Sequence, residues 1–218
     1  MSRQPSASHL ARRSGDARAI RAFVFDLDGV LTDTAEHHYF AWKRLADDEG
    51  IPFSREENEA LRGVSRRESL RLLLKGRAVS EEEAGELMAR KNAHYLASIR
   101  EVTASDLLPG VEGLLNEIRT SGMRIAVASS SKNAAQVIEA LGLREQVDVL
   151  CDGSSVDQPK PAPDLFLEAA RRLGVSPREC VAVEDAAAGI EAARRAGMRT
   201  VGIGPAARVG EADLVLPG

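Results

Sequence analysis

Residues 23–34 read Phe-Val-Phe-Asp-Leu-Asp-Gly-Val-Leu-Thr-Asp-Thr, an apolar run that leads directly into two carboxylates one residue apart. A short, continuous apolar run is typical of a strand that is buried on both faces of a parallel sheet. Such a strand cannot bury charge cheaply. We therefore expect Asp26 and Asp28 at its carboxyl end, the edge at which open α/β sheets bind ligands.

Two carboxylates at this spacing repel each other, and a divalent cation such as Mg²⁺, which prefers oxygen ligands, would remove that repulsion. The spacing also allows one acid to attack a substrate while the other moves a proton. The alternative is a turn with two solvated acids, because Asp-x-Asp alone is a weak motif. The apolar strand before the acids and the residues Gly29 to Thr34 after them favour the catalytic interpretation.

This stretch resembles motif I of the haloacid dehalogenase superfamily of phosphotransferases. The longer match through residues 35–38, Ala-Glu-His-His, and 41–43, Ala-Trp-Lys, is similar to the β-phosphoglucomutase family, and it extends from about residue 22 to the C-terminus. The resemblance implies an α/β fold with a Rossmann-like haloacid dehalogenase core, built on a parallel sheet, and an inserted all-α cap domain.

The whole chain limits the classes of function. Its 218 residues suit one core with room for an inserted module, and its net charge of −4 gives no sign of binding to nucleic acid or to an anionic membrane. No apolar run approaches the length of a membrane span. Cys151 and Cys180 lie in apolar runs, which indicates buried thiols in a reducing cytosol. We expect a cytoplasmic monomer whose partner is a small molecule.

Residues 1–19 are rich in Ser and Arg, contain Asp16 as their one acid and lack an apolar run, which argues against a secretory signal. We expect a disordered tail or a start placed upstream of the folded protein, with a transit peptide as the alternative. The rest divides into an α/β core at 20–33 and 105–218 and a helical cap at 34–104.

Helical patterns fill the expected cap. Thr34 is placed to cap a helix whose apolar positions recur at helical spacing, namely Ala35, Tyr39, Trp42 and Ala46. A polar helical stretch runs from Arg55 to about Leu74, and Ser80 with Glu83 forms a capping-box pattern ahead of a second long helix.

Two cations in the cap are candidates for the site. The break at Gly63 exposes a helix start next to Arg66, a pairing that suits an anion, although a solvated arginine in a turn is the commoner outcome. Lys91 lies at the edge of the apolar stripe of the second long helix, where a lysine usually extends to solvent.

In the core, the apolar strand at 124–128 ends in Ser-Ser-Ser-Lys-Asn, residues 129–133. Hydroxyls and helix-start amides at that edge predict a phosphate nest, and a plain helix cap is the alternative. Pro159 and Pro161 stiffen the loop around Lys160, which favours a fixed cation over a solvated one. A strand at 180–183 ends in Glu184 and Asp185.

Two strands that each end in an acid pair favour a cation site more strongly than either does alone. The resemblance implies that Asp26 is the nucleophile, that Asp28 is the general acid and base, and that Mg²⁺ is held by both with Glu184 and Asp185. It further assigns the transferring phosphoryl group to Ser129 and Lys160, and the remote phosphate to Arg66. The substrate-binding set is completed by Thr34, His38, Trp42, Gly63, Val64, Ser69, Lys91, Ser130 and Asn133.

The resemblance implies an activity that interconverts β-D-glucose 1-phosphate and glucose 6-phosphate through an aspartyl-phosphate and a 1,6-bisphosphate. A sugar phosphate phosphatase of the same superfamily is the main alternative, because the core motifs do not separate the two. Only the residues around Arg66, together with Lys91 and His38, favour the mutase over the phosphatase. A non-catalytic sugar-phosphate sensor is the second alternative, and the filled catalytic positions argue against it.

Overall fold

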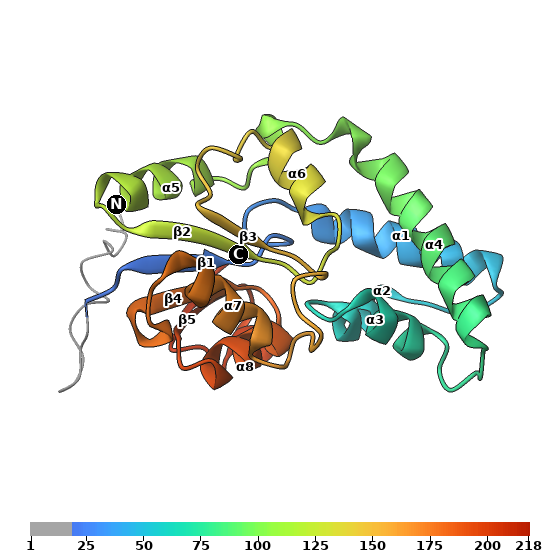
Figure 1. Cartoon of the computed structure of the whole chain (residues 1–218). Coiled ribbons are helices and arrows are strands. Elements are labelled where there is room, and N and C mark those ends of the chain that lie inside the picture. Colours follow the sequence, from blue (N-terminus) through green and yellow to red (C-terminus); the bar gives the residue numbers. More distant parts are fainter. Residues whose placement is uncertain (1–18) are drawn as a thin grey trace.

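A computed structural model describes residues 19–218. The expected disordered tail therefore lies, apart from its last residue, outside the described residues. A six-stranded parallel sheet forms the centre of the core, in the order β3-β2-β1-β4-β5-β6 (Figure 1). Its strands are β1 (Ala22–Phe25), β2 (Arg124–Ala128), β3 (Val149–Cys151), β4 (Cys180–Glu184), β5 (Arg199–Ile203) and β6 (Leu214–Leu216).

The first strand lies in the middle of this sheet, where Phe25 pairs with Val127 of β2 on one side and with Val183 of β4 on the other. Because the three strands are parallel, the residues that follow them leave at the same edge. This register brings Asp26, Ser129 and Glu184 to neighbouring positions at the carboxyl end of the sheet.

Helices cover both faces of the sheet (Figure 1). One face packs against α5 (Val111–Thr120) and α6 (Ala134–Ala140), and the other against α7 (Asp164–Leu173) and α8 (Ala187–Arg195). Alternate residues of β1 enter the two hydrophobic clusters, Phe23 and Phe25 on one side and Ala22 and Val24 on the other. The predicted α/β fold, with a strand buried on both faces, is confirmed.

An all-helical segment follows β1, as the fold class predicted. It contains α1 (Thr34–Asp48), α2 (Arg55–Asn58), η2 (Glu59–Leu61), α3 (Arg66–Leu73), α4 (Glu81–Ser98) and η3 (Ile99–Glu101), with η4 (Ala104–Asp106) at its exit. A separate hydrophobic cluster, which includes Trp42, Leu45 and Leu87, holds these helices together. This cluster supports our proposal that residues 34–104 form a cap domain and that residues 20–33 and 105–218 form the core domain.

Local details differ from the sequence predictions. Thr34 does not cap α1, because Asp33 is the N-cap residue and the Thr34 hydroxyl donates instead to Asp28. The break predicted at Gly63 within the helical stretch from Arg55 to about Leu74 is present, because Gly63 adopts a left-handed φ of 72° and α3 begins after it, at Arg66. The third strand, which the apolar run from Val147 to Cys151 predicts, begins only at Val149.

The structure describes both cysteines, which the sequence predicts to be buried thiols. Cys151 and Cys180 are free and buried, and burial raises the pKa of both thiols to about 11, so they are unreactive. Among residues 19–218, no helix combines the length and the apolar character that crossing a bilayer requires.

Two adjacent leucines of α5 provide a test of this packing. Leu115 is 0% exposed in the core, whereas Leu114 is 38% exposed. We expect Leu115→Ala to lower the free energy of unfolding by about 2–5 kcal/mol, because it leaves a cavity. Leu114→Ala should cost about 1 kcal/mol or less. Denaturant unfolding followed by circular dichroism measures both, and equal losses would contradict the arrangement of layers.

Candidate active site

Three buried carboxylates meet where β1 and β4 end. Asp26, Glu184 and Asp185 each present an oxygen within 4.8 Å of the others' oxygens. Glu184 is fixed by the local backbone, since its Oε2 accepts hydrogen bonds from the N–H groups of Asp185 (3.1 Å) and Ala186 (3.2 Å). Gly189 leaves the necessary room, because a Cβ there would lie 1.9 Å from Glu184 Oε1.

Lys160 lies among these acids with a side chain that is 0% exposed. Its Nζ donates to Asp26 Oδ1 at 2.7 Å, to Glu184 Oε1 at 2.5 Å and to the Ala128 carbonyl at 2.9 Å. Burial opposes the charge of Lys160, but Asp26 and Glu184 outweigh it and raise the lysine pKa. The lysine is therefore held as a permanent cation at the carboxyl end of the sheet.

The acids nevertheless retain an excess of negative charge. Burial, opposed by Lys160, raises the pKa of Glu184 to about 8, and burial together with Asp26 raises that of Asp185 to about 6. A buried, oxygen-only ligand set with uncompensated charge fits a hard divalent cation. The three carboxylates therefore have the chemistry of a binding site for such a cation.

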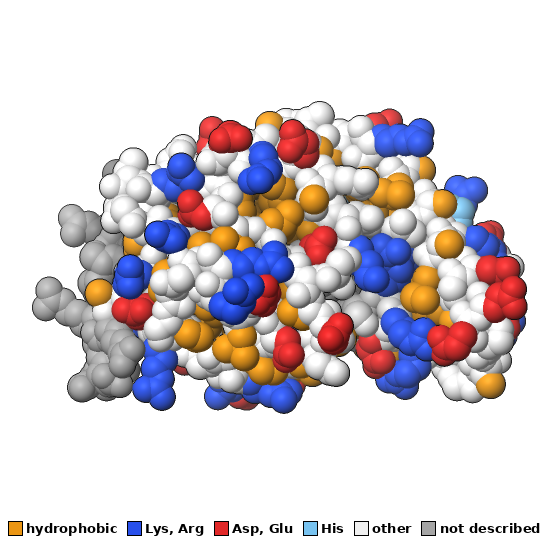
Figure 2. Space-filling view, in the orientation of Figure 1, with side chains coloured by type: hydrophobic (Ala, Val, Ile, Leu, Met, Phe, Trp, Pro, Cys, Tyr) orange, Lys and Arg blue, Asp and Glu red, His pale blue; other side chains and the backbone are white. Residues whose placement is uncertain are grey.

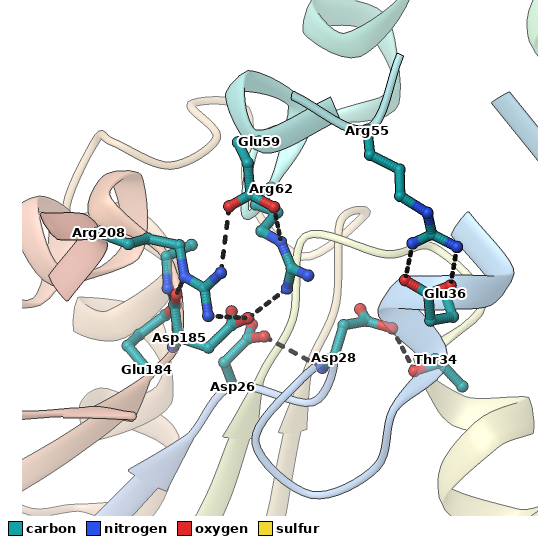
Figure 3. Close-up of polar contacts among 11 residues, drawn as sticks. Asp26, Asp28, Thr34, Glu36, Arg55, Glu59, Arg62, Glu184, Asp185 and Arg208 are labelled. Carbon is teal, nitrogen blue, oxygen red and sulfur yellow. Dashed lines mark hydrogen bonds and ion pairs between the residues drawn. The ribbon is translucent and has the colours of Figure 1, made fainter. Parts of the chain in front are cut away.

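Asp28 lies beside this cluster but turns its side chain away from it (Figure 3). Its backbone N–H donates to Asp26 Oδ2 at 3.1 Å, and its Oδ1 accepts from the Thr34 hydroxyl at 2.5 Å. Burial, followed by the charge of Asp26, raises the pKa of Asp28 to about 7. A carboxyl with such a pKa can gain and lose a proton near neutral pH.

A second polar group faces Asp28 from the cap. His38 Nε2 lies 3.7 Å from Asp28 Oδ1, and His38 Nδ1 lies 2.7 Å from Lys91 Nζ. Lys91 does not extend to solvent; it is 2% exposed, with its Nζ 5.0 Å from the Trp42 ring centre and 4.9 Å from that of Tyr95. Burial and the nearby Arg66 lower the Lys91 pKa to about 7, and burial and Lys91 lower the His38 pKa well below its usual value.

A cleft of about 700 Å³, open solvent at its mouth included, separates the core from the cap. Figure 2 shows this hollow, with Lys and Arg side chains gathered where the cap faces the core. Most of the residues predicted from the sequence line it: Asp26, Asp28, His38, Trp42, Gly63, Val64, Arg66, Ser69, Lys91, Ser130 and Asp185. Thr34, Ser129, Asn133, Lys160 and Glu184 lie behind this lining.

Two of the predicted residues connect the core to the cap by side-chain hydrogen bonds. The Ser130 hydroxyl donates to the Gly63 carbonyl at 2.7 Å, and Asn133 Nδ2 donates to Asn92 Oδ1 at 2.9 Å. Ser129 is fully buried, and its hydroxyl oxygen accepts from the backbone N–H of Ser131 at 3.1 Å. The serine-rich turn therefore both supports the site and contacts the cap.

Several cleft residues were not singled out from the sequence, namely Ala35, Asn58, Leu61, Arg62, Ser131 and Lys132. Ser131 and Lys132 occupy the predicted phosphate nest, so the motif itself was the signal for them. Arg62 precedes the Gly63 break, and its Nη1 donates to Asp185 Oδ2 at 2.7 Å (Figure 3). No local pattern marks a contact between residues so far apart in the chain.

Known proteins share this architecture. Residues 20–197 match the family model described as haloacid dehalogenase-like hydrolase. The chain is 45% identical to β-phosphoglucomutase of Bacillus subtilis, over 90% of this chain and 89% of that protein. It is 30% identical to a phosphorylated carbohydrates phosphatase of Thermotoga maritima, over 84% of each.

A solved structure gives the same result in three dimensions. The crystal structure of β-phosphoglucomutase from Clostridium difficile superimposes with a TM-score of 0.87 at 42% sequence identity, over 90% of each chain. The similarity therefore covers the cap as well as the core.

The raised carboxyl pKa values predict how stability depends on pH. Asp28, Glu184 and Asp185 have pKa values of about 7, 8 and 6 in the folded protein, so it retains protons that the unfolded chain has released. The free energy of unfolding of the metal-free protein should therefore fall as the pH rises from about 4 to about 8. A cation that binds the ionised carboxylates should oppose this fall.

Thermal unfolding at about pH 5.5 and about pH 8.5, in chelator and with added Mg²⁺, measures the effect. We expect the Mg²⁺-induced rise in Tm to be larger at the higher pH. Asp185→Asn serves as the control, because it should flatten the pH profile and reduce the rise. A wild-type Tm in chelator with the same pH profile as the Asp185→Asn variant would contradict the assignment.

Proposed function

The chain belongs to the haloacid dehalogenase-like hydrolase family, and from this premise we propose that it is a β-phosphoglucomutase, an isomerase that interconverts β-D-glucose 1-phosphate and glucose 6-phosphate. The observation that carries the proposal is one cleft in which Asp26 and Asp28 of the core face Arg66, His38 and Lys91 of the cap. The core acids supply the phosphoryl-transfer chemistry, and the cap cations supply a place for the rest of a sugar phosphate.

Asp26 is the nucleophile of the proposed cycle, and it carries the phosphoryl group as an aspartyl-phosphate. The 6-hydroxyl of β-glucose 1-phosphate attacks this phosphorus, the bond to Asp26 breaks, and Asp28 accepts the hydroxyl proton. After the 1,6-bisphosphate reorients, Asp26 attacks the 1-phosphate. Asp28 then returns its proton to the departing sugar oxygen, and glucose 6-phosphate leaves.

The charge of the transferring group needs a counterbalance. Lys160 and Ser129 would contact its oxygens from the core side. A divalent cation, which we propose to be Mg²⁺ held by Asp26, Glu184, Asp185 and the Asp28 carbonyl, would neutralise negative charge on the phosphoryl oxygens.

Arg66 suits the phosphate that does not react. Its guanidinium lines the cleft half-buried, and within residues 19–218 no carboxylate forms an ion pair with it. Burial lowers its pKa, so an anion at this position would stabilise its charged form. Ser131 and Lys132 line the same cleft and extend the phosphate-binding set beyond the residues expected from the sequence.

Proton transfer requires Asp28 to move. In this structure its Oδ1 is engaged by Thr34 at 2.5 Å, and His38 Nε2 is 3.7 Å away. On leaving Thr34, the Asp28 carboxyl turns toward the sugar oxygen within the cleft, where the His38–Lys91 pair can hold it. Thr34 thus holds the Asp28 carboxyl away from the position in which it would exchange a proton with the sugar.

A mutase must also keep water from its phosphoenzyme, and a closed cap does this. Polar side-chain contacts that join cap and core around the cleft include Ser130 with Gly63, Asn133 with Asn92, Arg62 with Asp185, and Arg208 with Glu59. Gly63 itself approaches the core so closely that a Cβ on it would lie 2.8 Å from the Ala186 Cβ.

The proposal includes a cytoplasmic, monomeric enzyme with a small-molecule sugar phosphate as its substrate. The buried free thiols support a reducing compartment. The phosphatase alternative is favoured by one observation, the 30% identity to a phosphatase of phosphorylated carbohydrates.

Incubation with β-glucose 1-phosphate, a trace of the 1,6-bisphosphate and Mg²⁺ separates the two activities. We expect glucose 6-phosphate to appear faster than free phosphate, and excess chelator to stop its formation. Asp28→Asn should lower kcat by about 10²–10⁴-fold, because it removes the proton carrier. Asp33→Asn, at an exposed acid in the same loop, is the matched control and should keep wild-type turnover. Free phosphate as the faster product would identify a phosphatase.

Arg66 and its neighbour Arg67 offer a second matched pair, since Arg67 is exposed and pairs with Glu81 on the cap surface. We expect Arg66→Ala to lower kcat/KM for β-glucose 1-phosphate by about 10- to 100-fold, the usual effect of losing a charged hydrogen bond. Hydrolysis of acetyl phosphate, which has no second phosphate, should fall much less. Arg67→Ala should leave both rates near wild type, and equal losses on both substrates in Arg66→Ala would remove its distal role.

A further inference from the structure

An ionic ring connects the cap to the metal-binding acids, and one of its members has no role in the proposed reaction. Arg208 lies in α9 (Ala206–Val209), far along the chain from the motifs. Its Nε donates to the Asp185 carbonyl at 2.7 Å, and its Nη1 donates to Glu59 Oε2 of the cap at 3.1 Å. Arg62 closes the ring, with Nε 3.2 Å from Glu59 Oε1 and Nη1 2.7 Å from Asp185 Oδ2 (Figure 3).

We propose that Arg208 is a positioning residue whose ion pair with Glu59 holds the cap closed over the acids and so directs the phosphoryl group to sugar and not to water. The inference rests on the proposed function, because it concerns the fate of phospho-Asp26. Transfer to water would break the bond between the Asp26 oxygen and phosphorus, form a bond from water oxygen to phosphorus and release free phosphate.

The core builds the position of Arg208 independently of the cap. Val209 is fully buried, and α9 lies so close to β5 that a Cβ at Gly202 would come within 2.7 Å of the Val209 Cβ. Gly204 leaves room for the guanidinium, since a Cβ there would lie 2.6 Å from Arg208 Nη2. With its Nε on the Asp185 carbonyl, the arginine is oriented so that its Nη1 reaches Glu59 of the cap.

The ring contains two residues from each side of the cleft. Glu59 and Arg62 belong to the cap, whereas Asp185 and Arg208 belong to the core. The Glu59 side chain is 49% exposed, so its ion pair would contribute little to the stability of a rigid protein. In a cap that opens and closes, the Arg208–Glu59 contact exists only in the closed state. Its full free energy then shifts the equilibrium between the open and closed states toward the closed one.

The ring also connects the closed position of the cap to Asp185, a carboxylate of the proposed reaction site. Asp185 is 5% exposed in its side chain and contacts Arg62, while Arg208 Nη2 lies 4.0 Å from the same Oδ2. Closing the cap thus brings one cation, Arg62, to a buried carboxylate of the site. Arg208 keeps Glu59 in place for this approach, and Glu59 in turn orients Arg62.

The test is a double-mutant cycle of Arg208→Gln, Glu59→Gln and the double variant. The readout is the ratio of free phosphate to glucose 6-phosphate formed from β-glucose 1-phosphate and the bisphosphate. We expect each single variant to raise this ratio about three- to tenfold, and the double variant to match the single ones, because all three lack the same pair. Added NaCl should raise the wild-type ratio toward theirs. Arg194→Gln, which breaks the exposed Arg194–Glu211 pair, is the matched control and should leave the ratio unchanged.

A binding measurement separates closure from chemistry. Trp42 lines the cleft and is the chain's single tryptophan, so its fluorescence reports binding of glucose 6-phosphate in chelator, without turnover. We expect the same three- to tenfold weakening of Kd in both single variants and no further loss in the double. Unchanged ratio and Kd, or effects of the two substitutions that simply multiply, would overturn the role of Arg208. Wild-type protein that forms no glucose 6-phosphate would overturn the proposed function, and the Trp42 titration would still test the ring.

Discussion

The constraint on which this structure depends is the burial of excess negative charge at the carboxyl edge of its sheet. Asp26, Glu184 and Asp185 converge there behind two apolar strands, and Lys160 compensates only part of their charge. The glycines around them are consequences of that constraint. Gly29, for example, has a φ of 82° and passes so close to Asp185 that a Cβ would lie 2.4 Å from its Oδ2. Such crowding requires a glycine at this position.

Much of this carboxyl edge could be predicted from the sequence, because short stretches of neighbouring residues determine it. An apolar run followed by acids marks a buried strand and its carboxyl end, and β1 and β4 both follow that pattern. That the two ends meet depends only on the parallel pairing of adjacent strands. Ser131 and Lys132, which line the cleft, likewise belong to the motif that predicted a phosphate nest, although they were not assigned individually.

What could not be predicted depends on contacts between distant residues. Arg62 and Asp185 are 123 positions apart, and Arg208 and Glu59 are 149 apart, so neither pair has a local signal. Thr34 shows the same limit at short range. Its position before a helix predicted a capping role, in which its hydroxyl oxygen would accept a hydrogen bond from a backbone N–H. The loop instead brings Asp28 within 2.5 Å of the hydroxyl, which donates to that carboxylate.

The polarity of the cleft connects these observations to a mutase. Its core side carries the acids, whose negative charge Lys160 balances only in part, so they require a further cation. Its opposite side carries Arg66, which has no carboxylate partner among the described residues. A sugar bisphosphate has an anionic group at each end, so either end satisfies either side. A cleft of this kind would hold a bisphosphate in either orientation, as the proposed exchange of phosphate between two positions of one sugar requires.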